Sequence, residues 1–586
     1  MSKFFLFYNT VKYMTYRQWY YRLFYTIRNK LINRYPVDVI EINNITKIRY
    51  IYTSIHIDNN VVSCAEELLS NVFDTVGGVK LKFNENIDWD LKNNTYRLLC
   101  FRLNSFKYLL SLSDAFHQTS NQVYIDKGFY FIDDWLRKNQ SRIQGDKWNP
   151  YVIAERLMNW IGFISNYCDN EKELREYAKH IAAQAYELKN SIEFQLGANH
   201  LLSEARALMY AGKFLSDVKL YDFGKKILLE EMQEQFLPDG GHYERSVSYH
   251  VEALQQGFEA SMLMKEFDDK DEELLSKSLY YPFVFLNSMI MSNGKIPLVN
   301  DAALDYPFLA TDFLSVANIL GWKPKNTNYG DYSIRWNLAE NKIFEELEEK
   351  TLFPDTGFYC SSFTSKGHKF SIFFDFGDNG PDYNLGHTHA DALNILITVD
   401  EKSLLVDSGV FSYMPGMQRD YCRSTAAHNT IEIDGKSNAE IWGAFRVAKR
   451  GHTRLLEYVD AEDNVVIFAS YDGYSKIFGR KMIHNRKICI DKKECIIEIF
   501  DSFETKTNTY TGNINYHIKP MSDVRKISNN IIEIDNIHTL EFSQSVDLKD
   551  CEIAERFGII QNAKLASSCI NISNDVVYIT KIKLFN

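Results

Sequence analysis

The sequence predicts an α+β multidomain protein in which helical hairpins precede an antiparallel β-sandwich. Length is the first observation, because 586 residues exceed what one ordinary hydrophobic core can organise. The second is a change of pattern at about residue 355: apolar residues recur at helical spacing before it, and short β-rich runs follow it. The third is composition, since 45% hydrophobic and 24% charged residues are typical of a globular protein.

The N-terminal segment, residues 1–37, holds seven basic residues, no acidic residue and many aromatic residues. Such a segment is either a basic amphipathic helix that lies on an anionic membrane or a helix that packs on the body of the protein. We favour packing and assign residues 1–60 to this N-terminal segment. It has neither the long apolar run nor the cleavage site of a secretory signal, so we expect a cytoplasmic location and leave a periplasmic one open.

Residues 61–340 are predicted to form a series of helices. In residues 151–167 apolar side chains recur every three or four positions, and Pro150 stands where a helix start favours proline. Residues 173–189 show the same period. Further helices are expected near 62–75, 104–117, 126–138, 199–217, 219–236, 246–266, 271–292 and 310–320. Helical hairpins in series can close into a toroid or extend as a solenoid, and the spacing alone leaves both open.

Residues 355–586 are predicted to form the antiparallel sandwich, after a linker over residues 322–354. Runs of β-branched and aromatic residues, separated by turn residues, predict its strands. These runs are Phe370–Phe376, Leu393–Val399, Ser403–Phe411, Thr430–Asp434, Val465–Tyr471, Lys487–Ile490, Cys495–Phe500 and Ile531–Ile534.

Charge and cysteine content exclude some classes of protein. The formal net charge of -11 argues against nucleic acid as the main partner. The chain has no apolar run of about 18 residues, so we expect no transmembrane segment. The nine cysteines form no CxxC pair and are odd in number, which favours a reducing compartment.

The first group of candidate functional residues lies in the predicted sandwich and contains His387, His389, Asp407 and His428. In an extended segment His387 and His389 share a face, so they could serve one site together. Imidazoles with a carboxylate are a ligand set suited to Zn²⁺. A simple hairpin does not bring His389 to Asp407, so a bend near Ala390 or another strand must join them.

Two further side chains of this region, Tyr413 and Arg423, suit an anionic or sugar ligand.

The second group of candidate functional residues lies in the helical part. Asn199 is expected to cap a helix there and to leave His200 facing an anion such as a carboxylate. The run DGGHYERSVSYH over residues 239–250 begins with a turn and continues with hydrogen-bonding residues, which suit a cleft wall. Its candidate functional side chains are His242, Glu244, Arg245 and Tyr249.

With both groups in view, the chain resembles heparinase II/III-type polysaccharide lyases. The resemblance covers most of the chain and rests on several motifs in the family's order. They are NH at 199–200, DGGHYERSVSYH at 239–250, GHTHAD at 386–391, LLVDSG at 404–409 and RSTAAHNT at 423–430. The resemblance implies an N-terminal (α/α) toroid followed by a C-terminal antiparallel β-sandwich, with the active site between them. Family members that cut sugar chains are mostly secreted with a signal peptide, which we do not expect here. The basic aromatic start instead resembles relatives encoded beside surface-polysaccharide biosynthesis functions.

The resemblance also implies roles for individual residues. Asn199 and His200 would contact a uronate carboxylate, while Tyr249 and His387 would be the catalytic tyrosine and histidine. A mainly structural zinc ion would be held by His389, Asp407 and His428. Candidate substrate contacts are His242, Glu244, Arg245, Tyr413 and Arg423.

These residues predict β-elimination on an anionic, uronate-containing polysaccharide or oligosaccharide. The C5 proton is removed, the C4–oxygen bond breaks, and an unsaturated uronate forms, which requires a neutralised carboxylate, a base and an acid. Tyr249 can be both base and acid when the proton and the leaving group share a face; otherwise His387 is the base. A field from Arg245 or Arg423 is expected to lower the pKa of Tyr249.

Two other functions stay open. An inverting glycoside hydrolase would need two carboxyl groups, for which Asp239, Glu244 and Asp382 are candidates. A non-catalytic factor in surface-polysaccharide production would need neither an acid nor a base. The sequence also leaves the uronic acid, the sulfation pattern and a homodimer open.

Overall fold

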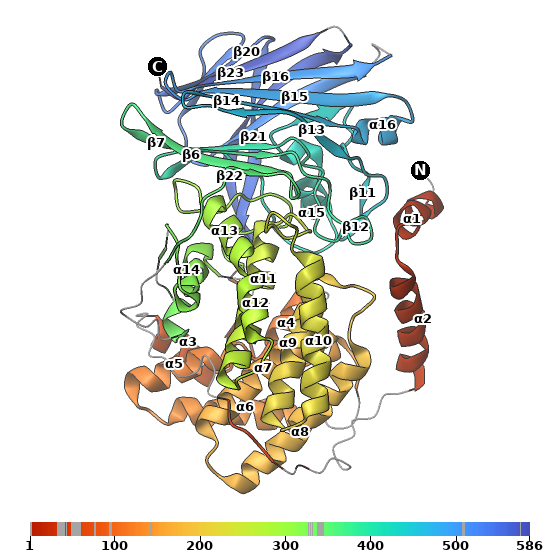
Figure 1. The fold of residues 1–586 in the computed structure, drawn as a ribbon, viewed down its shortest axis with the longest axis vertical. Coiled ribbons are helices and arrows are strands. Elements are labelled where there is room, and N and C mark those ends of the chain that lie inside the picture. The colour runs from red at the N-terminus through yellow and green to blue at the C-terminus, as the bar shows by residue number, and fades with distance from the viewer. Residues whose placement is uncertain are drawn as a thin grey trace.

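The computed structural model describes residues 3–31, 42, 44–48, 60–75, 78–92, 97–139, 143–306, 308–325, 327–328, 330, 332–336, 345–506, 510–574 and 576–585. A helical domain and a two-sheet domain are stacked along the long axis of the molecule (Figure 1). The predicted fold class is confirmed: an N-terminal helical toroid is followed by an antiparallel β-sandwich.

Helices make up most of the chain before residue 320. They are α1 (Lys3–Val11), α2 (Tyr16–Leu31), α3 (Val61–Leu69), α4 (Arg97–Ser105), α5 (Leu109–Thr119), α6 (Val123–Asn139), α7 (Pro150–Tyr167), α8 (Glu171–Ser191), α9 (Ala198–Phe214), α10 (Val218–Gln235), α11 (Val247–Glu266), α12 (Glu272–Ser278), α13 (Tyr280–Met289) and α14 (Ala310–Leu314). Connections of three to six residues join α7, α8, α9 and α10 in sequence, whereas eleven residues separate α10 from α11. Helix α9 lies at the centre of this group and packs against α7, α8, α10 and α11.

Local sequence explains where several helices begin and end. Pro150 opens α7 as predicted, and the Asn149 side chain caps the helix by accepting from Tyr151 N. The single helix expected over 271–292 is instead two, α12 and α13, which meet at Leu279. Pro282 lies in the first turn of α13, where a missing N–H costs no helical hydrogen bond.

Two antiparallel sheets form the C-terminal domain. The first has the strand order β21-β22-β17-β9-β8-β7-β6-β5, with β10 paired to β17, and the second has the order β13-β14-β15-β16-β23-β20-β19-β18. The strands of the first sheet are β5 (Leu352–Phe353), β6 (Phe358–Ser365), β7 (His368–Asp375), β8 (Ile395–Val399), β9 (Lys402–Leu405), β10 (Ile431–Ile433), β17 (Tyr510–Ile518), β21 (Val546–Arg556) and β22 (Ile559–Ile572). Those of the second are β13 (Thr453–Asp460), β14 (Asn464–Tyr471), β15 (Met482–Asp491), β16 (Ile496–Thr505), β18 (Val524–Lys526), β19 (Ile531–Ile534), β20 (His538–Phe542) and β23 (Val577–Lys583).

The inner faces of the two sheets share one apolar core. Ile372 of β7, Ile397 of β8 and Ile499 of β16 are fully buried within it. Buried and more exposed residues alternate along β16, because successive side chains of a strand point to opposite faces. Shorter elements lie outside these sheets: β1 (Val72–Asp74), β2 (Lys80–Lys82), β3 (Trp322–Lys323), β4 (Glu345–Glu346), β11 (Ile441–Trp442), β12 (Arg446–Val447), α15 (Met417–Cys422) and α16 (Gly473–Phe478).

One predicted strand is shorter than expected. The run Ser403–Phe411 was expected to be all strand, but β9 ends at Leu405 and the chain leaves the sheet before Asp407. Gly409 adopts a φ of +67° and lies against the backbone of Ala554, an approach that a side chain would block. This departure carries Asp407 out of the sheet, where it contacts Asn394 and His428. Part of the predicted linker, residues 337–344, lies outside the described residues.

The N-terminal helix pair, α1 and α2, lies along one side of the molecule and contacts both domains (Figure 1). Trp442 Nε1 donates to Thr10 Oγ1 at 2.9 Å, and Gln18 Nε2 donates to the carbonyl of Tyr383 at 3.1 Å. On the helical domain, the buried guanidinium of Arg28 pairs with Glu187 at 2.6 Å. Within the described part of the chain, no helix combines the length and the apolar character that a membrane span needs.

Candidate active site

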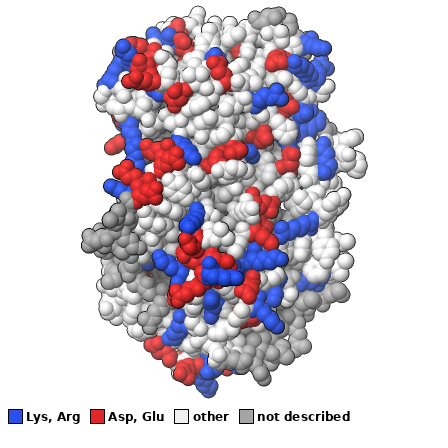
Figure 2. Space-filling model, in the orientation of Figure 1, with Lys and Arg blue, Asp and Glu red and all other residues white. Residues whose placement is uncertain are grey.

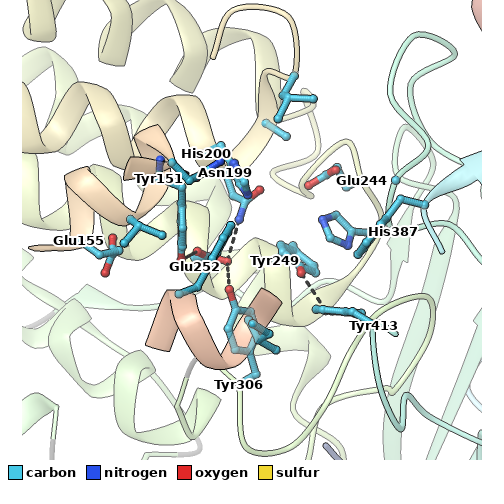
Figure 3. A pocket seen from close by; sticks show the side chains of 18 of the residues that line it. Tyr151, Glu155, Asn199, His200, Glu244, Tyr249, Glu252, Tyr306, His387 and Tyr413 are labelled. Atoms are coloured by element: carbon cyan, nitrogen blue, oxygen red, sulfur yellow. Dashed lines mark hydrogen bonds between the residues drawn. The ribbon is translucent and has the colours of Figure 1, made fainter. Parts of the chain in front are cut away.

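A cavity of about 1440 Å³ lies between the helical toroid and the sandwich. Small-molecule sites usually measure about 300–1,000 Å³, so this one has room for several sugar units. All four predicted catalytic residues line it, namely Asn199, His200, Tyr249 and His387 (Figure 3). The first three come from the first turns of α9 and α11, and His387 comes from the loop between β7 and β8.

Asn199 does not cap α9, contrary to the prediction. Gly197 precedes the helix with a φ of +70° and Ala198 has a φ of +54°, so Asn199 already lies inside the first turn. Its Nδ2 atom donates to Glu252 Oε2 at 3.0 Å. An asparagine amide has two N–H donors. Glu252 therefore fixes the amide in place while one donor stays available for a ligand.

His200 is held as a hydrogen-bond donor beside Asn199. Its Nδ1 lies 2.7 Å from Glu193 Oε2, and its ring stacks on Tyr151 with 4.5 Å between the centroids. Burial opposes the charged imidazolium, but the hydrogen bond to Glu193 outweighs it and raises the pKa of His200. The structure thus favours the protonated form that would best bind a carboxylate.

Tyr249 and His387 meet at the centre of the cavity, one from each domain. Their rings stack with centroids 3.7 Å apart, and Tyr249 Oη lies 2.8 Å from Tyr413 Oη. Burial raises the pKa of Tyr249 well above its usual value, and the neighbouring Tyr413 raises it further. The expectation of a lowered pKa was therefore wrong: Tyr249 is a neutral phenol that can donate a proton.

His387 is oriented by a carboxylate that the sequence analysis missed. Asp301 Oδ2 accepts from His387 Nδ1 at 2.9 Å, Asp301 Oδ1 lies 2.9 Å from His389 Nε2, and Arg419 pairs with both oxygens. With Nδ1 bonded to a carboxylate, the Nε2 of His387 is left as the atom that can accept a proton. Burial opposes ionisation of Asp301, but Arg419 and the two histidines hold its pKa well below the usual value.

Three of the five predicted substrate contacts lie outside the cavity, while Glu244 and Tyr413 line it. His242 is buried against Gln235, with 3.1 Å between Nε2 and Oε1. Arg245 donates to the carbonyl of Thr356 at 2.7 Å, and Arg423 donates to the carbonyls of Thr388 and Gly443 at 2.9 Å. Both arginines donate to backbone carbonyls, and neither is among the groups that shift the pKa of Tyr249.

The cavity also contains functional candidates that the sequence analysis did not single out. Glu252, one helical turn after Tyr249, accepts from Asn199, from Tyr306 Oη at 2.7 Å and from Tyr151 Oη at 3.0 Å (Figure 3). In the sequence, only the position of Glu252, three residues after Tyr249 on the same helix, indicated that it could share the site.

Two cations of the toroid, Arg102 and Lys107, face the same cavity without a salt bridge among the described residues, although, against the effect of burial, the nearby charges of Glu252 and Glu155 raise the pKa of Arg102. Arg102 lies over the ring of Tyr306 at 5.5 Å, on the side chain that also contacts Glu252. Neither its guanidinium nor the ammonium of Lys107 forms a hydrogen bond or ion pair within the described part of the chain. The side chain of Lys107 is exposed within the cavity, where partial desolvation by the surrounding walls and the nearby charge of Arg102 lower its pKa. An anion bound between them would relieve that repulsion.

The three predicted metal ligands lie close together and are buried. The rings of His389 and His428 have centroids 5.4 Å apart, and His428 Nδ1 lies 2.8 Å from Asp407 Oδ2. Among the described residues, the other nitrogens, His389 Nδ1 and His428 Nε2, are buried without a hydrogen-bond partner of good geometry, although the backbone of Cys422 lies near His428; imidazole nitrogens of this kind suit a metal. Asp407 is engaged by Asn394 and by Gly409 N, and no three metal-type side chains of the described residues converge on one point. The two imidazoles fit zinc, and the complete site stays a prediction.

Comparisons with known proteins agree with this arrangement. Residues 18–346 match the heparinase II/III N-terminus, and residues 345–569 match the heparinase II/III-like C-terminal domain. The chain is 23% identical over 424 residues to a heparin-sulfate lyase of Bacteroides stercoris, which covers 64% of this chain and 60% of that protein. It is 24% identical over 378 residues to a heparin-sulfate lyase of Pedobacter heparinus, covering 60% and 53%. The match thus spans less than two thirds of each relative's length.

Solved structures share the fold at low sequence identity. A crystal structure of heparinase III superposes with a TM-score of 0.72 and 17% identity over 93% of this chain and 88% of that one. Heparan sulfate lyase HepC from Pedobacter heparinus gives a TM-score of 0.60 and 16% identity over 97% and 88%. The family models cover both domains and meet where helical structure gives way to strands. The chain therefore belongs to the heparinase II/III family.

Proposed function

We propose that this protein is a polysaccharide lyase that cleaves a uronate-containing glycan by β-elimination. The observation that carries the proposal is the convergence of Asn199, His200, Tyr249 and His387 on one cavity. The names of the heparin-sulfate lyases that it resembles support the same class of reaction.

Neutralising the substrate carboxylate is the first requirement of the reaction. The C5 proton is barely acidic, because the charge left by its removal would spread into a carboxylate that is already negative. Asn199 offers a fixed N–H donor, and protonated His200 offers a charged one. Preorganised donors of this kind are worth roughly 3–4 kcal/mol each by analogy with oxyanion sites.

A base and an acid then divide the proton transfers between them. His387 is suited to accept the C5 proton at Nε2, because Asp301 occupies its Nδ1. Tyr249 is suited to protonate the departing C4 oxygen, because burial keeps its phenol neutral. This division fits substrates whose proton and leaving group lie on opposite faces. When they share a face, Tyr249 would have to perform both transfers.

The metal belongs to the proposal as a structural element. A zinc ion held by His389 and His428, with Asp407 beside them, would tie the sandwich loops next to the cavity and leave the elimination to side chains. Metal analysis of the purified protein is expected to find about one zinc per chain, and chelation to lower its Tm by several degrees. His428→Gln should contain no zinc and should not respond to chelator. Wild-type protein that is free of metal and indifferent to chelator would contradict the site.

The cations Arg102 and Lys107 are proposed to bind an anionic group on a sugar next to the cleaved bond. Arg102→Gln is expected to raise KM about 10–100-fold with kcat little changed, because a charge-assisted hydrogen bond contributes about 1.5–3 kcal/mol. Steady-state kinetics on a charged oligosaccharide would measure this. Arg454→Gln, an exposed arginine on the sandwich, is the matched control. An unchanged KM in Arg102→Gln would remove the residue from the binding site.

The proposed reaction is tested by incubating the protein with a panel of uronate glycans and scoring the products by mass. Sulfated glycans are tested first, because the relatives are named heparin-sulfate lyases. Products with unsaturated uronate ends are expected, whereas plain reducing ends would indicate a glycoside hydrolase and no product a non-catalytic factor. Of the hydrolase's candidate carboxyl groups, Asp239 is engaged by Thr356 at 2.7 Å and lies outside the cavity, whereas Glu244 and Asp382 line it, so the product assay decides between the two reactions.

A further inference from the structure

The N-terminal helix pair has two faces, and only one of them is accounted for by the fold. The inner face of α2 consists of Gln18, Tyr21, Arg22, Tyr25 and Arg28, at intervals of three or four residues. Tyr25 Oη donates to the carbonyl of Ile192, Tyr21 stacks on Phe194 with centroids 4.6 Å apart, and Arg22 lines the active-site cavity. This face attaches the pair to the body of the protein.

The outer face is apolar and exposed. On α2 its large side chains again recur at helical spacing, with relative exposures of 96% for Tyr16, 64% for Leu23 and 53% for Ile27. The residues that make up the outer face are Phe4, Phe5, Tyr8, Tyr16, Trp19, Tyr20, Leu23, Phe24 and Ile27. The outer-face residues of each helix form an apolar stripe, and such a surface marks an interaction site, because soluble monomers rarely leave large apolar patches uncovered.

The charge of the pair indicates what the outer face binds. Residues 3–28 contain five basic residues and no acidic one, although the whole chain carries a net charge of -11. Lys3 and Lys12 are exposed, whereas Arg17 pairs with Glu231 of the helical domain at 3.4 Å and Arg22 lines the cavity. Figure 2 shows mainly white and blue side chains along the edge of the molecule where the pair lies in Figure 1.

We propose that the outer face of the helix pair docks on an anionic membrane surface. Exposed Trp, Tyr and Phe are the residues that favour the lipid–water boundary, and lysine and arginine beside them complement anionic headgroups. A second copy of the chain is a poorer occupant, since pairing two outer faces would bring the same cations together with no acid between them. The surface is peripheral, because no described helix is suited to cross the bilayer.

Docking would place the catalytic cavity next to the lipid. Phe7, Thr10, Val11, Met14 and Arg22 of the same two helices line that cavity. The cavity and the membrane would therefore be separated by about the diameter of one helix, roughly 10–12 Å. This inference does not depend on the proposed lyase reaction.

Sedimentation of the full chain with lipid vesicles tests the proposal. Wild-type protein is expected to bind vesicles of mixed phosphatidylcholine and phosphatidylglycerol at least about tenfold better than vesicles of phosphatidylcholine alone, and less at high salt. The triple variant Tyr20→Glu/Leu23→Glu/Ile27→Glu should lose this binding about tenfold or more. A matched control, Val459→Glu/Met521→Glu/Ile527→Glu, adds the same charge at exposed apolar positions of the sandwich and should bind like wild type.

Thermal unfolding and light scattering separate a loss of membrane binding from misfolding and from dimerisation. The thermal unfolding of both triple variants should match that of wild type, because all six side chains are exposed. Light scattering reports the mass in solution. The proposal is overturned if wild type binds neither kind of vesicle, if the two triple variants bind equally, or if wild type is a dimer that only the outer-face variant dissociates. In the last case the stripe is a contact between two copies of the chain.

Discussion

Replacing Tyr249 by Phe is expected to lower kcat by about 10²–10⁴-fold while KM changes only a few-fold. The substitution removes one oxygen and leaves the ring stacked on His387, so substrate should still find the same shape. What is lost is the proton that the phenol gives to the departing C4 oxygen. The effect belongs to the chemical step, and single-turnover kinetics on a cleavable uronate oligosaccharide would measure it directly.

Tyr413→Phe provides the comparison for this variant. Tyr413 also lines the cavity and its hydroxyl lies 2.8 Å from that of Tyr249, so both substitutions break the same hydrogen bond. Each should cost about 1 kcal/mol of unfolding free energy at most. If Tyr413 only positions Tyr249, its variant should lose about tenfold or less in kcat. Wild-type turnover in Tyr249→Phe would refute the assigned role, and equal losses in both variants would show that the hydrogen bond matters more than the proton donor.

The sequence predicted the site wherever local pattern carried the information. His387 and His389 were expected to share a face, and they contact the two oxygens of one carboxylate. The motif order predicted that α9, α11 and the sandwich would meet, and Asn199 and Tyr249 do line one cavity with His387. These successes rest on residues whose role is visible within a short segment or a known motif.

The failures concern residues whose role depends on a distant partner. Asp301 has no motif around it, and it reaches His387 and Arg419 only because the fold closes a separation of 86 and 118 residues. Arg245 and Arg423 were predicted to bind an anion, but their guanidinium groups donate hydrogen bonds to backbone carbonyls of the surrounding loops. A sequence shows which side chains can bind an anion, while the fold decides which of them are already occupied.

Asp301→Asn is expected to destabilise the fold and to inactivate the site together. Asp301 is fully buried and is the ion-pair partner of the equally buried Arg419. Removing one partner of a buried pair leaves the other charge uncompensated and costs about 3–5 kcal/mol. His387 would also lose the carboxylate that fixes its tautomer, because an asparagine amide has only one oxygen for the two histidines and carries no charge, which should lower kcat by about 10²–10⁴-fold. Denaturant unfolding and steady-state kinetics would measure the two effects separately.

The pH dependence of the same variant gives an independent check. The pKa of Asp301 is depressed by folding, so its contribution to stability is fully present above the unfolded value of about 3.9 and is lost as the pH falls toward the folded value. The difference in unfolding free energy between wild type and Asp301→Asn should therefore be constant near neutral pH and shrink below about pH 4. A difference that does not shrink would mean that the carboxylate is not ionised in the folded protein.

A double variant separates the structural role of Asp301 from its role in positioning His387. Asp301→Asn/Arg419→Met removes the stranded charge along with its partner, and such replacements of a buried pair are often neutral for stability. We expect the double variant to recover most of the lost unfolding free energy. Its kcat should stay low, because the carboxylate at Nδ1 of His387 is still missing. Recovery of both quantities would show that Asp301 acts on catalysis only through stability, and His387 would then need another residue to orient it as the base.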